Sequence, residues 1–214
     1  MYFHDRFQAG KLLEKELDQK YRYEDCIGIA LNEGSVLVGV EICKSLHCLI
    51  NLLLIEEIYL PNEPEIVGAL TIDDKFSLSK NFSSDFLDEN REFIEEEKIK
   101  TISKINAIHN LGNVLNKKNI MGRNVILISD GLKSTLPLEV AYEYLKPLKI
   151  NKLVIATAIA TVDVVDWMHM YADEVHCLDV IEGVLELNHY YKVNTIPNRR
   201  KIVDLVNNII LNWK

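Results

Sequence analysis

The chain has 214 residues, of which 48% are hydrophobic and 26% charged, and this ordinary balance excludes a disordered or fibrous chain. Its formal net charge is −8 at pH 7, and acid is concentrated in residues 85–97, which we interpret as the solvated face of a helix. An acidic surface without a basic stripe repels phosphate backbones, which argues against nucleic-acid binding.

The first predicted element is a helix over residues 6–18. Asp5 can cap it, and its apolar stripe is formed by Phe7, Leu12, Leu13 and Leu17. The charges of Asp5 and Arg6 and the lack of an apolar core region argue against a secretory signal. The longest apolar stretch, residues 36–60, is broken by Glu41, Lys44 and His47, so it falls short of the roughly 18 apolar residues of a membrane span. We expect a cytoplasmic protein that does not bind membranes.

Residues 26–55 have the pattern of a β-α-β unit. A strand is predicted over 26–31, a turn over 32–35, a helix over 36–46 and a second strand over 49–55. Both strands are nearly continuous apolar runs, which is typical of a parallel sheet covered on both faces.

The middle of the chain departs from this alternation. Residues 56–82 contain prolines and a glycine around a short apolar run, which predicts a loop and a hairpin strand outside the parallel core. A long helix is predicted over 84–117, with a stripe at threefold spacing formed by Ile99, Ile102, Ile105, Ile108 and Leu111.

After Gly122 the α/β alternation resumes. Strands are predicted over 124–129, 152–160 and 174–178, and helices over 138–148, 162–172 and 198–214. The last helix has an apolar stripe of Ile202, Leu205, Val206, Ile209 and Ile210. No repeat or low-complexity linker divides the chain, so one α/β domain over residues 1–214 is the economical assignment.

Two turns of this predicted sheet are candidate ligand sites. Residues 32–35 follow the first strand, residues 129–137 follow the third, and each turn precedes a helix. Ligands of open parallel sheets bind at the carboxyl ends of the strands, and backbone N–H groups at a helix N-terminus favour an anion.

Other combinations of reactive residues do not form a site in the sequence. His169 with Met170 and His176 with Cys177 lack a closed set of metal ligands, and residues 129–131 lack the flanking glycines of a nucleophile elbow. Reduced core thiols are predicted for Cys26, Cys43, Cys48 and Cys177. Trp167 and Trp213 are predicted to lie in the core or an interface.

Four segments in collinear order carry a family resemblance. Residues 125–138 resemble the ribose-phosphate loop of type I phosphoribosyltransferases. Three others resemble segments of a stand-alone branch of that superfamily, namely FHDRFQAGKLL (3–13), LPNEPEIVGAL (60–70) and YADEVHCLD (171–179). The resemblance implies a central parallel sheet flanked by helices, with residues 56–120 forming a hood or arm.

The family's loop binds phosphoribosyl pyrophosphate, and this chain departs from its pattern. In the family, two adjacent acids bind the ribose hydroxyls, and a Thr-Gly-x-Thr turn binds the 5'-phosphate, with Mg²⁺ on the pyrophosphate. Here Ser129 replaces the first acid and Asp130 keeps the second. Gly131 fits the pattern and Ser134 stands for the opening threonine, but Thr135 replaces the glycine and Pro137 the closing threonine, which removes a backbone N–H.

Two further positions of the family's pocket have changed charge. Where the branch has Gly-Leu-Pro-Arg-Gly-Gly near the pyrophosphate, this chain continues from Ala30 and Leu31 into Asn32, Glu33, Gly34 and Ser35. An arginine-to-glutamate reversal about 6 Å from one phosphate charge changes the interaction by on the order of 5 kcal/mol at an effective dielectric near 20. The family's Arg-Lys pair after the second strand is Glu56-Glu57 here.

We therefore predict a non-catalytic relative that senses a nucleotide or sugar phosphate or acts as an interaction module. A vestigial ligand loop would comprise Asp130, Gly131, Lys133, Ser134 and Thr135, and an acidic rim of Glu33, Glu56 and Glu57 would face one pocket. No catalytic residue, metal or cofactor is expected. The alternatives are an active phosphoribosyltransferase, which would need Mg²⁺, and a structural subunit of a homo- or hetero-oligomer. The long helix and the frequent dimerisation of similar proteins suggest the second alternative.

Overall fold

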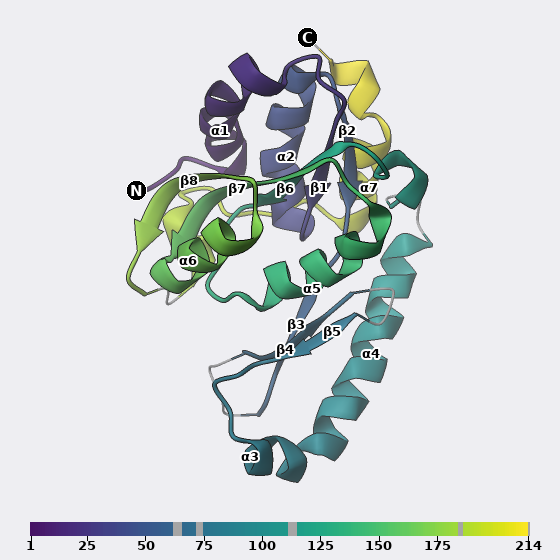
Figure 1. Cartoon of the computed structure of the whole chain (residues 1–214), viewed down its shortest axis with the longest axis vertical. Helices are drawn as coiled ribbons and strands as arrows, with labels where there is room; N and C mark the ends of the chain where they lie inside the picture. The colour runs from purple at the N-terminus through teal and green to yellow at the C-terminus, as the bar shows by residue number, and fades with distance from the viewer. Residues whose placement is uncertain (62–65, 72–74, 111–114, 184–185, 214) are drawn as a thin grey trace.

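The fold is an α/β body with a smaller hood. A computed structural model describes residues 1–61, 66–71, 75–110, 115–183 and 186–213. The body contains a five-stranded parallel sheet in the order β2-β1-β6-β7-β8 (Figure 1). Its strands are β1 (Cys26–Ala30), β2 (Leu49–Leu52), β6 (Asn124–Ser129), β7 (Lys152–Thr161) and β8 (Glu174–Ile181).

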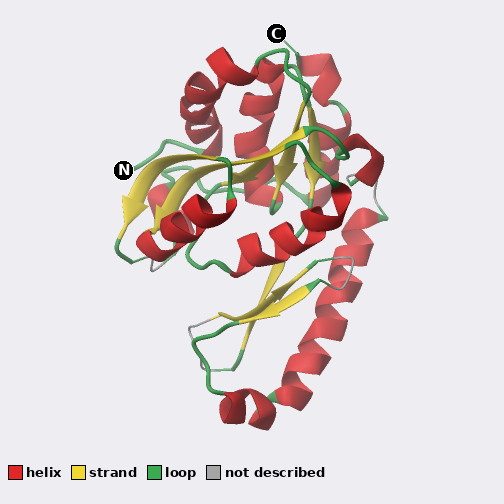
Figure 2. Ribbon diagram, in the orientation of Figure 1, coloured by secondary structure: helices red, strands yellow, loops and turns green. Residues whose placement is uncertain are grey.

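Helices cover both faces of the sheet, as the continuous apolar strands require. One face carries α1 (Arg6–Tyr21), α2 (Glu33–Leu46) and α7 (Arg199–Asn207), and the other carries α5 (Leu136–Leu145) and α6 (Val162–Tyr171), as Figure 2 shows. The apolar residues of β1, β6 and β7 are thereby removed from water on both sides, which is the main stabilising term of this architecture, whereas the edge strand β8 is only partly covered.

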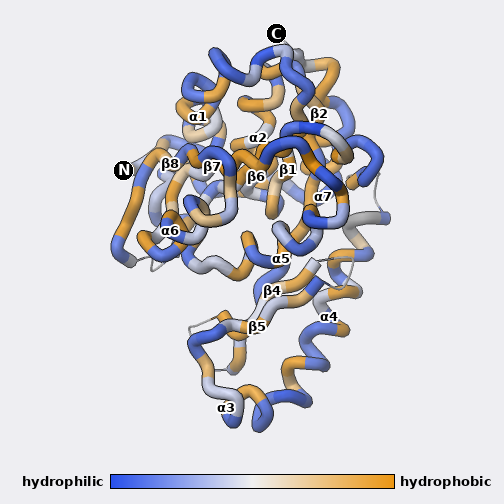
Figure 3. Tube along the Cα trace, viewed as in Figure 1, coloured by the Kyte–Doolittle hydropathy of each residue, from blue (hydrophilic) through white to orange (hydrophobic). Residues whose placement is uncertain are grey.

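The hood extends from the carboxyl-end side of the sheet. It contains an antiparallel three-stranded sheet of β3 (Glu56–Tyr59), β4 (Ile66–Leu70) and β5 (Phe76–Leu78), followed by α3 (Ser84–Glu89) and α4 (Arg91–His109). The hood sheet packs against α4 on one side and α5 on the other. Hydrophobic and hydrophilic segments alternate along α4 in Figure 3, as expected for a helix with one solvated face.

Short single-turn helices complete the described chain. They span Lys117–Asn119, Lys146–Leu148, Leu187–Tyr190 and Ile209–Asn212. Among the residues that the structure describes, no helix combines the length and the apolar composition of a membrane span.

Several sequence predictions were wrong in their boundaries. The segment predicted as a turn over 32–35 forms the cap and first turn of α2, because the Asn32 side chain accepts the Ser35 N–H at 2.7 Å. The first helix extends to Tyr21, and the second strand ends at Leu52 rather than 55. The last strand continues to Ile181, since it pairs with the long strand β7.

The middle region differs most from its prediction. The described residues between 56 and 82 form three strands rather than a loop and one hairpin strand. The helix predicted over 84–117 is divided at Asn90, whose side chain bonds the Phe86 carbonyl at 2.9 Å and competes with helix continuation. In the predicted stripe Ile105 is buried but Ile99 is exposed, and Leu111 lies outside the described residues.

The C-terminal helix is shorter than predicted. It ends at Asn207 and is followed by the single turn Ile209–Asn212, with Ile202, Val206 and Ile209 buried and Ile210 exposed. Trp167 is buried as predicted, whereas Trp213 is partly exposed and stacks on His47 with ring centroids 5.7 Å apart. All four cysteines are free thiols; Cys26, Cys43 and Cys48 are buried as predicted, whereas Cys177 is only partly buried.

Candidate functional site

Two cavities open at the carboxyl ends of the sheet strands, next to the loop that follows β6. The smaller has a volume of about 250 Å³ and is bordered by the ends of β1 and β6, by β3 and by Leu187. The larger, of about 550 Å³, lies between the hood and α6, beyond the same loop. Both are bordered by Lys133, so the predicted ligand loop forms the wall between them.

Asp130 is held in a buried ion pair. Its Oδ2 accepts a hydrogen bond from Arg6 Nε at 2.7 Å, and the two side chains are 5% and 3% exposed. Its Oδ1 accepts from Ser35 Oγ at 3.1 Å. The one acid retained from the family's ribose-binding pair therefore has both carboxylate oxygens bonded inside the protein.

Arg6 is fixed in turn by the segment after β8. Its other guanidinium nitrogens donate to Asn188 Oδ1 at 2.8 Å and to the Asn194 carbonyl at 3.2 Å, and the guanidinium lies 4.5 Å from the centroid of the Tyr191 ring. Tyr191 also donates its hydroxyl to the Asp130 carbonyl. Arg6 and the segment 188–194 thus hold the Asp130 side chain and backbone in place, and we call this group of contacts the Asp130 lock.

Two glycines beside Asp130 lie very close to other side chains. A Cβ on Gly34 would lie 2.4 Å from Asp130 Oδ2 and 2.8 Å from Arg6 Nε. A Cβ on Gly131 would lie 2.4 Å from the Leu187 side chain. Both glycines were predicted to lie near a ligand, and here each makes room for another part of the chain.

The Ser129 hydroxyl is used within the loop. It donates to the Gly131 carbonyl at 3.0 Å and accepts from the Gly131 N–H at 3.1 Å. Leu132 then pairs with β7, donating to Ile159 at 2.9 Å and accepting from Thr161 at 3.2 Å. The loop is therefore an ordered extension of the sheet.

The segment corresponding to the phosphate turn has one unsatisfied hydroxyl. Ser134 Oγ is buried and has no hydrogen-bond partner within the part of the chain that the structure describes. Thr135 Oγ1 instead donates to Glu139 Oε1 at 2.8 Å, and Glu139 Oε2 accepts from Ser77 Oγ of the hood at 3.0 Å. Thr135 makes no side-chain cap bond to α5, and Pro137 occupies its first turn.

Lys133 connects this loop to the hood. Its Nζ lies 2.5 Å from Tyr59 Oη and 3.8 Å from Glu57 Oε2, and Tyr59 donates its hydroxyl to Glu57 at 2.6 Å. Burial, together with the Glu57 carboxylate, raises the pKa of Tyr59. The positive charge of the candidate ligand loop, on Lys133, is thus paired with a carboxylate of the acidic rim.

Only two of the three glutamates of the predicted acidic rim lie at the same cavity. Glu56 and Glu57 both border the smaller cavity, whereas Glu33 does not and pairs with Arg199 at 3.4 Å. Burial raises the pKa of Glu56. Lys104 and Arg199 oppose that shift, and Glu33 and Glu57 add to it. Cations of the same chain offset part of the repulsion among these acids.

No metal centre is evident within the described ranges. They contain no cluster of three or more histidine, cysteine, aspartate or glutamate side chains that could hold an ion. His176 instead lies between Glu16 Oε2, at 3.0 Å from Nδ1, and Glu174 Oε1, at 2.8 Å from Nε2.

Sequence reasoning missed the residues that lock Asp130. Arg6 lies in the quoted FHDRFQAGKLL segment, so its conjunction with Asp130 could have been suspected from that motif. Leu187, Asn188 and Tyr191 follow the last strand and carry no local signal. The roles of Glu139 and Tyr59 depend on how the hood packs, which no sequence spacing reveals.

The sheet order, the loops after β1 and β6 and the appended hood give the chain a type I phosphoribosyltransferase-like fold, as the resemblance implied. No family model matches the sequence. Curated relatives from two strains of Mycobacterium tuberculosis, provisionally named phosphoribosyl transferases, are each 24% identical over 185 residues, or 82% of this chain. The chain spans 40% of the length of these relatives.

Solved structures share the fold over nearly the whole chain. The crystal structure of TT1426 from Thermus thermophilus superposes with a TM-score of 0.72 at 19% identity, covering 100% of both chains. The AQ2163 protein from Aquifex aeolicus superposes with a TM-score of 0.51 at 12% identity, covering 94% of this chain and 86% of that one.

Proposed function

We propose that this chain binds a phosphorylated small molecule, a nucleotide or a sugar phosphate, and does not transfer phosphoribosyl groups. It would then act as a sensor or interaction module that retains the scaffold of the transferases. The relatives' provisional name makes active transfer the alternative, and the first experiment below separates the two.

The state of Asp130 is the observation that carries this proposal. A carboxylate that binds ribose hydroxyls must present its oxygens to the ligand, but the Asp130 side chain is 5% exposed and bonded to Arg6 and Ser35. Releasing it would leave the Arg6 guanidinium buried and unpaired, which costs about 3–5 kcal/mol for a pair of this kind. The family's first acid is absent, because Ser129 stands there with its hydroxyl bonded to Gly131.

The candidate pyrophosphate position supports the same conclusion. Asn32 and Glu33 occupy the start of α2, where the backbone N–H groups of the transferase loop would meet an anion. The Asn32 side-chain oxygen Oδ1 already accepts the Ser35 N–H, and Glu33 adds a negative charge at the helix terminus. Both features disfavour a bound pyrophosphate.

The loop after β6 supports binding of an anion smaller than pyrophosphate. Lys133 supplies a positive charge, and the buried Ser134 hydroxyl lacks a partner among the described residues. A buried hydroxyl without a hydrogen bond costs about 1–3 kcal/mol, which an accepting phosphate oxygen would recover.

Transfer is tested with phosphoribosyl pyrophosphate, Mg²⁺ and a panel of nucleobases. We expect no pyrophosphate release above a protein-free blank, while an active phosphoribosyltransferase assayed in parallel shows that the reagents work. Turnover near 1 per second, at the low end for working enzymes, would establish the alternative.

Binding is tested by thermal melting with ribose 5-phosphate, AMP, GMP and sulfate. A ligand at one hundred times its dissociation constant adds about 2.7 kcal/mol, which for a chain of this size raises Tm by roughly 5–10 °C. The Ser134→Ala/Thr135→Ala variant should lose the shift. If no ligand raises Tm, or the variant responds like the parent, the binding proposal is wrong.

A further inference from the structure

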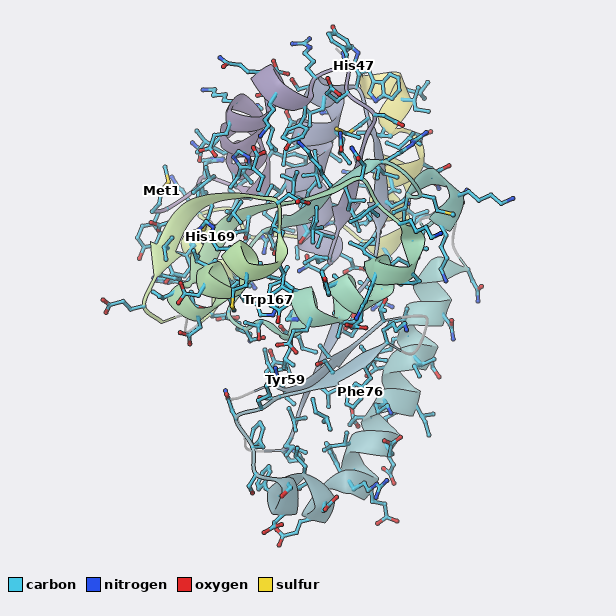
Figure 4. The ribbon with its side chains drawn as sticks, in the orientation of Figure 1. Met1, His47, Tyr59, Phe76, Trp167 and His169 are labelled. Atoms are coloured by element: carbon cyan, nitrogen blue, oxygen red, sulfur yellow. The ribbon has the colours of Figure 1, made fainter. Side chains whose placement is uncertain are left out.

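The free end of the hood is acidic. In Figure 1, α3 lies at the end of the hood that is farthest from the sheet of the body, and α4 begins beside it. Figure 4 shows side chains at this end whose oxygen atoms point away from the ribbon. Four carboxylates here are exposed and form no ion pair within the described residues, and we call them the acidic tip: Asp85, Asp88, Glu89 and Glu92.

The amino ends of the sheet strands carry a basic surface. Two turns meet there, because the Gly122 N–H donates to the Lys149 carbonyl at 3.2 Å and the Asn151 N–H donates to the Arg123 carbonyl at 2.8 Å. These turns and the residues beside them expose four lysines, which we call the lysine patch: Lys117, Lys118, Lys149 and Lys152. The lysines come from two separate segments of the chain, so the sequence alone shows no basic stripe.

The fold leaves most of this positive charge uncompensated. Asp25, beside the patch, is paired with Arg123 at 3.0 Å. By contrast, Lys118, Lys149 and Lys152 form no ion pair in the part of the chain that the structure describes. Like charges that are held close together repel one another, and an acidic surface placed against the patch would relieve this repulsion.

The acidic tip and the lysine patch cannot meet within one molecule. The tip lies at the start of α4, whose 19 residues span about 28 Å at 1.5 Å per residue. The hood extends from the carboxyl-end side of the sheet, whereas the patch lies at the amino ends of its strands (Figure 1). The two complementary surfaces can therefore make contact only between different copies of the chain.

Both surfaces also carry apolar groups. Met121 lies between the two pairs of lysines in the sequence of the patch and is 54% exposed. Beside the acidic tip, the half-buried rings of Phe82 and Phe86 stack with their centroids 5.0 Å apart. Exposed ion pairs alone contribute little affinity, so an apolar contact inside a ring of charges is the arrangement that gives a specific interface.

We infer that copies of this chain associate head to tail, with the acidic tip of one copy on the lysine patch of the next. The net charge of −8 makes two copies repel on average, so only an arrangement that brings tip and patch together is attractive. Since tip and patch are different surfaces, each added copy brings a further free surface. Association therefore continues beyond a dimer, into a closed ring or an open chain.

Sedimentation velocity of the full chain tests this contact. At about 0.1 M NaCl, the weight-average mass should rise with protein concentration and exceed that of a dimer. At about 1 M NaCl the Debye length falls from about 10 Å to about 3 Å, so the association constant should fall at least about tenfold.

Charge reversal locates both surfaces. Lys118→Glu/Lys149→Glu and Asp88→Lys/Glu92→Lys should each weaken association at least about tenfold, because like charges then face one another. A mixture of the two variants should associate again, since the reversed tip of one matches the reversed patch of the other. All four positions are exposed, so the variants should fold with the parent Tm.

Lys11→Glu/Lys15→Glu is the matched control. It changes the net charge as much as the patch variant does, but on exposed positions of α1, and it should associate like the parent. Equal losses in the patch variant and this control would overturn the assignment of the patch.

Three other outcomes would overturn the head-to-tail contact. One is a chain that stays monomeric at every accessible concentration. Another is a dimer whose mass responds neither to salt nor to the variants, because such a dimer uses other surfaces. The third is binding of a labelled single-stranded RNA to the parent but not to the patch variant without any self-association, which would assign the patch to nucleic acid.

Discussion

At the residue scale, the centre of the candidate site is a buried hydrogen-bonded group, the Asp130 lock, formed by Arg6, Ser35, Asp130 and Tyr191. In the transferases the acid at the position of Asp130 binds the ligand. Arg6, Asp130 and Ser35 are buried and satisfy one another, and Tyr191 closes the group. A buried pair of this kind contributes little net stability compared with apolar residues, but removing one member is costly. The lock therefore predicts strong and non-additive effects of substitution.

Breaking the Arg6–Asp130 pair tests the lock. Asp130→Ala should lower the free energy of unfolding by about 3–5 kcal/mol, because a buried guanidinium loses its counter-charge. Arg6→Met/Asp130→Ala should be less destabilised than the sum of its single variants, as measured by urea unfolding. Removing the exposed pair of Lys146 and Glu143 should cost less than about 1 kcal/mol. Additive losses at Arg6 and Asp130 would show that the two residues act separately.

Gly34 is required by the same lock. Its Cβ would overlap Asp130 Oδ2 at 2.4 Å, so Gly34→Ala should destabilise the fold by roughly 1–3 kcal/mol and lower Tm by several degrees. Gly183→Ala is the control, because an added Cβ there meets nothing within 4 Å. If both variants have the same Tm as the parent protein, the side chains around Gly34 can shift to make room for a Cβ.

At the element scale, the hood is tied to the phosphate loop by side chains rather than by a shared sheet. Lys133 bonds Tyr59 of β3, and Glu139 of α5 joins Thr135 to Ser77 of β5. These contacts place hood and loop so that both cavities have defined walls.

Replacing Glu139 tests the contribution of these contacts. Glu139→Ala removes two hydrogen bonds worth about 1 kcal/mol each, so backbone amides of β5 should exchange with solvent roughly tenfold faster or more. Glu143→Ala, one turn further along α5 and exposed, should leave that exchange unchanged. Unchanged protection of β5 in the Glu139 variant would show that apolar packing alone positions the hood.

At the scale of the whole molecule, two carboxylates should give pH effects of opposite sign. Burial alone would raise the pKa of Glu174, but hydrogen bonds from Lys20, Tyr21 and His176 outweigh it and lower the pKa to about 2. Its contribution is therefore fully present above the unfolded-state pKa near 4.5 and is lost as the pH falls towards 2. The pKa of Glu56 is raised by burial, so its ionised form opposes folding at neutral pH.

Urea unfolding between pH 7 and pH 2 measures both effects. Glu174→Gln should be less stable than the parent at pH 7 and should converge with it near pH 2. Glu56→Gln should be more stable than the parent at pH 7, and this gain should vanish below pH 4, where Glu56 is protonated in both states. Parallel pH profiles for the parent and either variant would contradict the assigned environment of that carboxylate.

The sequence by itself determined the parallel sheet, the free thiols and the position of the loop after β6. These follow from local patterns, since a strand buried on both faces must be continuously apolar, as in residues 124–129, and the loop after it must lie at the sheet edge. The sequence also shows the differences from the phosphoribosyltransferase pattern at Ser129, Glu33 and Pro137, because each of them changes the chemistry of its own position.

Only the tertiary structure decided what Asp130 contacts and where the cavities lie. Its partners Arg6 and Tyr191 are 124 and 61 residues away, and whether a carboxylate meets a guanidinium or a ligand depends on chain segments that no local spacing relates. The same is true of Glu33 beside Arg199, and of the hood, whose three strands were predicted as one. Short strands such as β5 are stabilised by packing on α5 rather than by their own pattern, so the physical information that specifies them is not local.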